Sequence, residues 1–324
     1  MKKSLKKSRP VRYSSGLEKS KIVVILGPNA SGKSALGVKL AKKFNGEIIS
    51  ADSRQVYRGL DIGTGKITQK ETRGIPHHLL DVASPKKQLS AADFKKLAAN
   101  AVTDISRREK LPIVAGGTGF WIDSLIYDTG LPEVPPSQKL RRALAGKTAP
   151  ELLKILKKLD QKRAKTVEQK NPRRLIRAIE IAKTLGRVPK IEMPKYQNIF
   201  KSPYQTLWIG LNPAYEVGLR KIEKRVKRMI KAGLLTETKK LLRGRVSKKR
   251  IREFGFEYRA VLEYLGRKIS KKELREKITR DSLNYARRQM VWFKRNNEIK
   301  WIKNPEGAER LCRIFLTKKD SGKK

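Results

Sequence analysis

The stretch Gly27-Pro28-Asn29-Ala30-Ser31-Gly32-Lys33-Ser34 decides the fold of this chain. It fits the pattern G-x-x-x-x-G-K-[ST], a glycine-rich loop that joins a strand to a helix and binds phosphate. The apolar run Ile22 to Leu26 precedes it as a strand would, and apolar residues follow it at helical spacing up to Phe44. We therefore expect every residue of the loop to contribute to binding a phosphorylated ligand, chiefly through backbone N–H groups.

Two side chains of this loop carry chemistry of their own. Lys33 supplies a positive charge for the phosphates, and the Ser34 hydroxyl is a suitable ligand for Mg²⁺. The sequence thus predicts a magnesium site at Ser34. The loop alone does not identify the phosphorylated ligand as ATP.

Strand and helix patterns alternate on both sides of the loop. Residues 47–51, 111–115 and 206–211 read as strands, and residues 91–108 read as a helix. This alternation predicts an α/β fold, with a P-loop-containing parallel sheet flanked by helices. Ligands of such a sheet bind at the carboxyl ends of its strands, where the phosphate loop lies.

Prolines and charge divide the chain into parts. We expect a P-loop catalytic core with C-terminal helices over residues 21–130 and 204–316. Proline-bearing stretches bound a basic, helical insertion over residues 131–203. Residues 1–20 and 317–324 are basic and have little to bury, which predicts a disordered arm and tail.

The charge of the chain is strongly unbalanced. It has 78 Lys and Arg against 30 Asp and Glu, for a formal net charge of +48, and a pI near 10.6. The simplest interpretation is a polyanionic partner such as nucleic acid. A general solubility bias is the alternative, because lysine is spread along most of the chain.

Cysteine usage and hydropathy point to a compartment. Cys312 is the only cysteine, which excludes an intramolecular disulfide and a cysteine-based zinc site and fits a reducing cytosol. No apolar run approaches the length of a membrane span. We therefore expect a cytoplasmic protein without a membrane partner, and we take a monomer as the default.

Polar residues follow two of the predicted strands. Asp52 comes just after residues 47–51, and its carboxylate could bind Mg²⁺ through water, act as a general base or cap the next segment. Position alone leaves these three roles open. The run Gly116-Gly117-Thr118-Gly119 follows residues 111–115 and offers the Thr118 hydroxyl to a ligand, although a tight strand-to-helix turn is an equal alternative.

Other polar residues give weaker signals. No aspartate ends the strand at residues 111–115, and Asp81 is a poor substitute, which argues against ordinary NTP hydrolysis. His77 and His78 are adjacent, so their side chains diverge in an extended segment. We interpret them as hydrogen-bonded structural histidines rather than metal ligands.

Two basic segments stand out from the general charge. Residues 171–177 open a helix at Pro172, with Arg174 and Arg177 three residues apart. Residues 285–295 mix cations with aromatic rings, a combination that suits phosphates and unpaired bases. A solvated basic face over a tryptophan-anchored core is the alternative.

In order along the chain, these segments resemble the tRNA dimethylallyltransferases, or tRNA isopentenyltransferases, of the IPP transferase family. The resemblance runs from about Lys21 to Trp301. It rests on an ordered series of segments: 27–34, 49–55, 57–66, 76–81, 90–94, 116–119, 171–180, 229–235 and 287–293.

The resemblance implies transfer of a dimethylallyl group from dimethylallyl diphosphate to N6 of the adenosine just 3′ of the tRNA anticodon, with Mg²⁺ assisting the departure of pyrophosphate. It implies that Asp52 deprotonates the attacking amine and that Thr118 contacts the flipped adenosine. Lys33 and Arg225 would hold the pyrophosphate. The residues implied to contact the anticodon stem-loop are Asp52, Ser53, Arg54, Gln55, Thr118, Arg141, Arg173, Arg174, Arg177, Arg252, Arg259, Arg287, Arg288 and Gln289.

Four positions depart from the family pattern. Asn29 replaces a usual threonine, so a hydroxyl contact there becomes an amide contact. Gly65 replaces a usual alanine, which we expect to be innocuous. Asn171 replaces a frequent aspartate, which questions any charge-dependent role. Phe256 replaces a usual tyrosine, so a phenolic hydrogen bond would be lost.

Three alternatives remain beside this interpretation. An isopentenyltransferase that acts on free adenine nucleotides shares the catalytic core but has less need of the basic insertion. A small-molecule P-loop kinase is the second alternative, and the absence of an aspartate at the end of the strand at residues 111–115 argues against it. A non-enzymatic RNA-binding protein would have no use for Lys33, Ser34 and Asp52 together.

Overall fold

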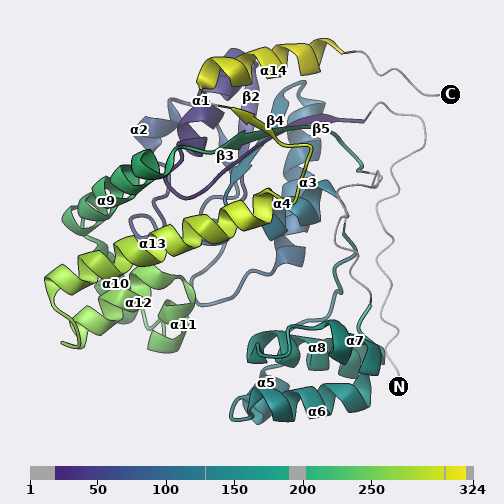
Figure 1. Ribbon diagram of the computed structural model, residues 1–324. Coiled ribbons are helices and arrows are strands. Elements are labelled where there is room, and N and C mark those ends of the chain that lie inside the picture. The colour runs from purple at the N-terminus through teal and green to yellow at the C-terminus, as the bar shows by residue number, and fades with distance from the viewer. Residues whose placement is uncertain (1–18, 128, 190–201, 303, 319–324) are drawn as a thin grey trace. The chain divides into compact units, whose positions relative to one another are not determined.

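The computed structural model describes residues 19–127, 129–189, 202–302 and 304–318 (Figure 1). Most of the basic arm and tail predicted for residues 1–20 and 317–324 lies outside the described residues. The chain forms a core unit and a smaller unit, Thr129–Met193. Each unit is described by itself.

The core unit is built on a six-stranded sheet with the order β3-β2-β4-β1-β5-β6. Every strand pair is parallel, which confirms the predicted sheet. Its strands are β1 (Lys21–Leu26), β2 (Gly46–Ser50), β3 (His77–His78), β4 (Leu111–Gly116), β5 (Gln205–Leu211) and β6 (Lys300–Ile302). The short edge strands β3 and β6 have too few residues for a periodic signal, and we did not predict them.

Side chains of β1 alternate between the two faces of the sheet. Val23 and Ile25 pack with α1 (Lys33–Lys43) and α14 (Pro305–Thr317), whereas Val24 and Leu26 pack with α3 (Ala91–Arg107) and α4 (Gly119–Ile126). Figure 1 shows α1 and α14 on one side of the sheet. Because both faces are covered, the strands are nearly continuous apolar runs.

The second face of the sheet carries a further layer of helices. Its members are α9 (Tyr215–Lys231), α10 (Leu234–Arg243), α11 (Lys248–Glu253), α12 (Phe256–Leu265) and α13 (Lys271–Phe293), while the single turn α2 (Gln69–Thr72) precedes β3. In α9 the side chains of Ile222, Val226 and Met229 are buried, but Tyr215 at its start is 55% exposed. The first turn of α9 therefore lies beyond the core.

The smaller unit is helical in its described residues. It contains α5 (Gln138–Leu144), α6 (Ala149–Leu159), α7 (Gln161–Thr166) and α8 (Pro172–Leu185). Leu152, Leu156, Leu175 and Ile179 form the centre of its own apolar core. Asn171 caps α8 by accepting a hydrogen bond from the Arg174 N–H, a role that needs no charge.

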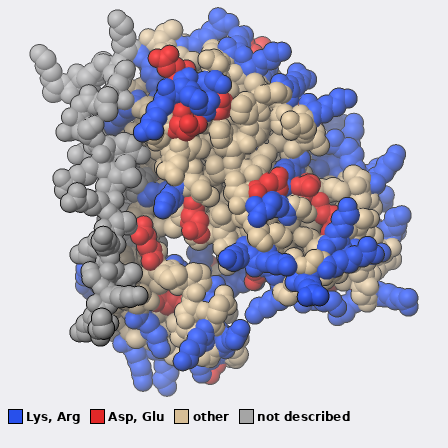
Figure 2. All heavy atoms as spheres, turned by 180° about the vertical axis from the view of Figure 1, so that it is seen from behind, with Lys and Arg blue, Asp and Glu red and all other residues tan. Residues whose placement is uncertain are grey.

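The described surface is rich in basic side chains. On the face drawn in Figure 2, Lys and Arg are far more widespread than Asp and Glu. In the part of the chain that the structure describes, no helix has the length and hydropathy that a membrane crossing requires.

Candidate active site

The phosphate loop joins β1 to the N-terminus of α1. Glycine is required at two of its positions. A Cβ on Gly27 would lie 2.6 Å from the Leu211 carbonyl oxygen, and Gly32 has a φ of 97°. The first-turn N–H groups of α1 have no acceptor within the helix. They are therefore available to an anion, as the sequence predicts.

Lys33 lies over this loop and is half-buried. Its ammonium donates to the Pro28 carbonyl oxygen at 2.8 Å. Burial lowers the pKa of Lys33 to about 8, with the Asp52 carboxylate opposing this effect and the Arg225 guanidinium adding to it. The three predicted catalytic residues Lys33, Asp52 and Arg225 are therefore close enough to interact electrostatically.

The ends of β2 and β4 are joined by hydrogen bonds just beyond the sheet. The Ala51 N–H donates to the Ala115 carbonyl at 2.9 Å, and the Thr118 N–H donates to the Ala51 carbonyl at 3.2 Å. The Ser53 N–H in turn donates to Thr118 Oγ1 at 3.1 Å. These bonds bring Thr118 beside Asp52, as expected for neighbouring parallel strands.

Asp52 uses one carboxylate oxygen to shape its own turn. Its Oδ1 accepts from the backbone N–H of Arg54 at 2.9 Å and of Gln55 at 3.4 Å. Oδ2 has no hydrogen-bond partner within the described residues. Capping is thus a real role of Asp52, and the second oxygen remains available for a proton or a metal-bound water.

Arg225 comes from α9 and reaches the loop that follows β2. Its Nη2 donates to the Thr64 carbonyl at 3.0 Å, and burial lowers its pKa. Gly65 has a φ of 57°, and a Cβ there would lie 2.3 Å from Arg225 Nη2. The Arg225 guanidinium therefore occupies the place that an alanine methyl group would take at position 65.

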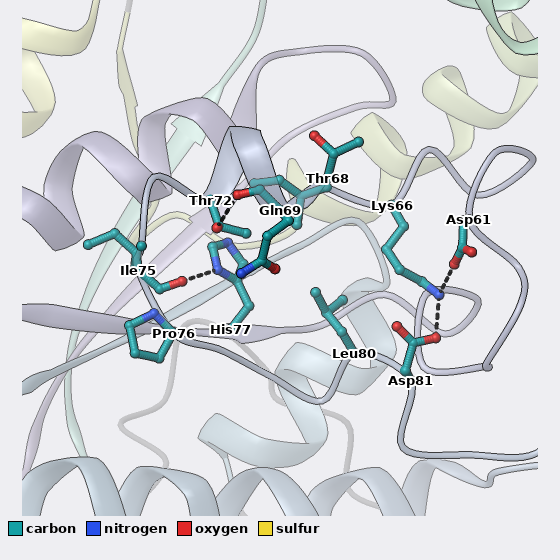
Figure 3. A pocket seen from close by; sticks show the side chains of 12 residues that line it. Asp61, Lys66, Thr68, Gln69, Thr72, Ile75, Pro76, His77, Leu80 and Asp81 are labelled. Atoms are coloured by element: carbon teal, nitrogen blue, oxygen red, sulfur yellow. Dashed lines mark hydrogen bonds and ion pairs between the residues drawn. The ribbon is translucent and has the colours of Figure 1, made fainter. Parts of the chain in front are cut away.

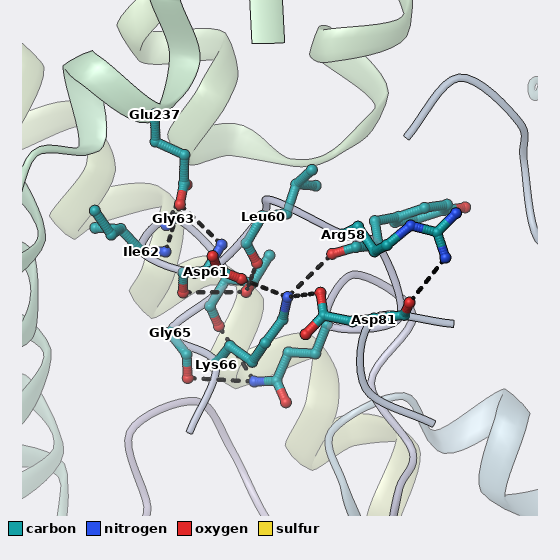
Figure 4. Close-up of polar contacts among 12 residues, drawn as sticks. Arg58, Leu60, Asp61, Ile62, Gly63, Gly65, Lys66, Asp81 and Glu237 are labelled. Carbon is teal, nitrogen blue, oxygen red and sulfur yellow. Dashed lines mark hydrogen bonds and ion pairs between the residues drawn. The ribbon is translucent and has the colours of Figure 1, made fainter. Parts of the chain in front are cut away.

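A buried carboxylate holds residues 61–65 in place (Figure 4). Glu237 of α10 accepts from the backbone N–H groups of Asp61, Ile62 and Gly63 at 2.8, 2.7 and 3.0 Å. The Tyr258 hydroxyl donates to the same carboxylate at 2.8 Å. Glu237 thereby fixes the segment whose carbonyl groups receive Arg225.

Arg54 is held within the protein rather than left free. Its guanidinium pairs with Glu257 at 3.1 Å and lies over the rings of Phe256 and Tyr285 at 5.4 and 5.2 Å. Burial raises the pKa of Glu257, and Arg54 opposes this shift. Phe256 needs no phenolic hydroxyl for this contact, because its ring face receives the cation.

Helix α13 presents two different faces. Arg287 and Arg288 are exposed, as an RNA contact requires. Gln289, which was expected to contact tRNA, is only 6% exposed and bonds to two loops of the core. Its position four residues after Tyr285 and four before Phe293 is the periodic signal that could have revealed this burial.

The other predicted RNA-contacting arginines fall into two groups. In the smaller unit, Arg141 and Arg177 both pair with the buried Glu180, at 2.7 and 3.3 Å, and so stabilise that unit. The exposed arginines, which remain candidates for RNA contact, are Arg173, Arg174, Arg252 and Arg259. Gln55 lies beside Asp52 and donates to the Gly65 carbonyl at 3.3 Å.

Comparison with known proteins identifies the family. The family model for IPP transferase matches residues 55–296. The chain belongs to the IPP transferase family. It is 40% identical over 285 residues to a tRNA dimethylallyltransferase of Anoxybacillus flavithermus, covering 87% of this chain and 90% of that protein. It is 41% identical over 298 residues to that of Pediococcus pentosaceus, covering 90% and 94%.

Solved structures of IPP transferases share the fold. The tRNA isopentenylpyrophosphate transferase of Bacillus halodurans matches with a TM-score of 0.66 and 33% identity, over 92% of this chain and 95% of that one. A eukaryotic dimethylallyltransferase acting on tRNA matches with a TM-score of 0.73 and 25% identity, over 92% and 77%. The predicted family, fold class and type of enzyme are confirmed.

Few side chains of this IPP transferase are available as ligands for Mg²⁺ at the phosphate loop. The Ser34 hydroxyl is exposed and makes no hydrogen bond within the described residues. In the same residues, no group of three or more His, Cys, Asp or Glu side chains could hold a metal ion. A Mg²⁺ ion here would be held by Ser34 and mainly by phosphate oxygens and waters.

A pocket of about 600 Å³ lies beside β3 and is lined in part by Asp61, Lys66 and His77 (Figure 3). Its polar groups include Lys66, which pairs with Asp61 and Asp81 at 2.5 and 2.6 Å. His77 Nδ1 bonds to the Ile75 carbonyl, and His78 Nε2 bonds to Glu47. Asp81 and the two histidines thus have structural partners, and the phosphate loop does not line this pocket.

Proposed function

We propose that this chain transfers a dimethylallyl group from dimethylallyl diphosphate to N6 of the adenosine 3′-adjacent to the anticodon of tRNA, releasing pyrophosphate. The names of its relatives, tRNA dimethylallyltransferases, support this proposal. The observation that carries it is the convergence of Asp52 and Thr118 with the phosphate loop at neighbouring strand ends. A site for a diphosphate leaving group thereby adjoins a site for a nucleophile.

The phosphate loop supplies the leaving-group half of the reaction. As the allylic C–O bond breaks, negative charge develops on the pyrophosphate. The free N–H groups at the start of α1 and the cations Lys33 and Arg225 stabilise that charge. Mg²⁺ bound at Ser34 would neutralise further phosphate charge.

Asp52 and Thr118 supply the nucleophile half. The adenosine N6 forms the new C–N bond and loses a proton, which Asp52 Oδ2 accepts. Asp52 Oδ1 stays bonded to the turn during this step, so the base keeps its orientation. The Thr118 hydroxyl lies at the same strand ends and contacts the adenosine.

The exposed arginines supply the RNA contacts. A base inside a stem-loop must leave its stack to reach Asp52, which costs a few kcal/mol that backbone contacts offset. Arg287 and Arg288 on α13 and the exposed arginines of α8, α11 and α12 are available for the anticodon stem-loop. We further propose that the enzyme acts in the cytoplasm as a monomer.

One product analysis separates this proposal from its alternatives. The protein is incubated with dimethylallyl diphosphate, Mg²⁺ and either tRNA or AMP, and the nucleosides are identified by mass spectrometry. We expect dimethylallyladenosine in digested tRNA. Prenylated AMP with unmodified tRNA would identify a free-nucleotide transferase. Transfer of labelled γ-phosphate from ATP to a metabolite would identify a kinase.

A further inference from the structure

Gln289 connects two loops of the active site through the two ends of its amide. Its Oε1 accepts from the Asn29 N–H of the phosphate loop at 2.8 Å. Its Nε2 donates to the Gly117 carbonyl at 2.9 Å. We propose that Gln289 is a positioning residue that holds the phosphate loop at a fixed distance from Thr118, and so aligns leaving group and nucleophile.

The local packing matches an amide at this position. The loops present one donor and one acceptor, and a carboxamide satisfies both at once. Gly117 leaves the necessary room, since a Cβ there would lie 2.3 Å from Gln289 Nε2 and 4.0 Å from Lys33 Nζ. Gly117 therefore faces both the Gln289 amide and the Lys33 ammonium.

The hydrogen bonds continue from Gln289 to Asp52. Gly117 immediately precedes Thr118, whose Oγ1 accepts from the Ser53 N–H next to Asp52. A displacement of the Gly117 carbonyl would thus move Thr118 and the turn that carries the base. Misplacement of reacting groups by about 1 Å can cost on the order of a hundredfold in rate.

Helix α13 has a second anchor on α4, the helix that follows this loop. Trp292 Nε1 donates to Asp123 at 2.8 Å, and its ring fills the space that a Cβ on Gly119 would need. Arg287 and Arg288 lie on the exposed face of this helix. The helix that faces RNA with its arginines is therefore bonded directly to both halves of the active site.

This inference rests on the proposed function, and its test uses the full chain. Gln289→Met keeps the approximate size of the side chain and removes both hydrogen bonds. Gln289→Glu keeps the acceptor for Asn29 but places an oxygen opposite the Gly117 carbonyl. Arg280→Gln is the matched control, because Arg280 is exposed on the same helix and belongs to no site described above.

Three quantities are measured for each variant: the single-turnover rate at saturating tRNA and dimethylallyl diphosphate, the Kd for tRNA, and the melting temperature. We expect both Gln289 variants to lose about ten- to a hundredfold in rate, with an unchanged Kd for tRNA. We expect Arg280→Gln to keep the saturated rate of the wild type.

A saturated rate of the folded Gln289 variants equal to that of the wild type would overturn the inference, even if their melting temperature falls. A salt-dependent rise in the Kd for tRNA as the main effect would also overturn it, because Gln289 would then act as an RNA contact. Failure of the wild type to prenylate tRNA is a separate result, which would contradict the proposed function itself.

Discussion

At the residue scale, Lys33 combines a cationic role with an environment that disfavours its charge. Burial is the largest cause of its lowered pKa, and the Arg225 guanidinium adds to it. The folded pKa lies near 8, below the ordinary value of 10.5. Between these two pH values the unfolded chain holds more protons than the folded one, so the cost of burying this charge falls as pH rises.

This shift predicts a pH dependence of substrate binding. The free enzyme loses the Lys33 ammonium above about pH 8, so kcat/KM for dimethylallyl diphosphate should fall by about tenfold per pH unit there. In Lys33→Arg the cation persists, because a guanidinium keeps its proton over this range. Steady-state kinetics of the wild type and of Lys33→Arg between neutral and alkaline pH check these two expectations. Parallel declines in the two proteins would show that another group titrates.

Asp52 divides its two oxygens between structure and chemistry. Asp52→Asn keeps an oxygen for the Arg54 N–H and removes the base, so we expect turnover to fall by about 10² to 10⁴ with little change in tRNA affinity. Asp52→Ala should show the same loss of turnover and an added loss of stability, because the Arg54 N–H then loses its partner. Turnover and tRNA Kd are measured together. Near-normal turnover of Asp52→Asn would exclude the base role.

The sequence predicts the location of some residues of the site but not the contacts of others. Asp52, Lys33 and Thr118 were predictable, since strand ends of a parallel sheet meet at one edge. The structural roles of Arg54 and Arg141 were not, because their partners Glu257 and Glu180 are far away in the sequence. An isolated glutamate in a helical pattern looks like a surface residue.

At the scale of elements, the segment of residues 61–65 depends on α10 and α12. Glu237 accepts three backbone N–H groups from this segment and the hydroxyl of Tyr258. Because Glu237 is buried, removal of its carboxylate leaves several donors without a partner. Arg225 depends on the same segment through the Thr64 carbonyl.

We therefore expect Glu237→Ala to lower the free energy of unfolding by about 3 to 5 kcal/mol. Tyr258→Phe removes only one of the four hydrogen bonds and should cost about 1 kcal/mol. Urea denaturation measures both values. The account of this segment would be contradicted if the two variants lost equal stability.

The long strands and helices followed from periodicity, whereas their pairing over long range did not. The helix predicted over residues 91–108 is α3, Ala91–Arg107, and its Ser90 cap is visible in the sequence. The contact of α13 with the phosphate loop joins residues 260 positions apart. The spacing of Gln289 from Tyr285 and Phe293 indicates that its side chain is buried, but it does not identify the loops that it contacts.

At the scale of the whole molecule, the charge of +48 makes RNA affinity sensitive to salt. The place of an arginine on the surface should nevertheless affect tRNA affinity more than its contribution to the net charge. Arg287 is exposed on α13, whereas Arg310 is exposed on α14, which packs on the opposite face of the sheet. A glutamine at either position changes the net charge equally.

We expect Arg287→Gln to reduce the slope of log K against log salt for tRNA binding by about 0.7 to 0.9, the value for one lost phosphate contact. Arg310→Gln should leave that slope unchanged. Binding titrations across a salt series measure both. Equal slopes for the two variants would favour a diffuse charge effect and would remove α13 from the RNA-binding surface.

The most direct test of the central claim locates the modification in tRNA. Purified protein is incubated with unmodified tRNA, dimethylallyl diphosphate and Mg²⁺, and the tRNA is cut with a nuclease and mapped by mass spectrometry. The account predicts that one dimethylallyl group is added to the adenosine just 3′ of the anticodon. A dimethylallyl group at another nucleotide, or an unmodified tRNA beside prenylated free nucleotide, would contradict it.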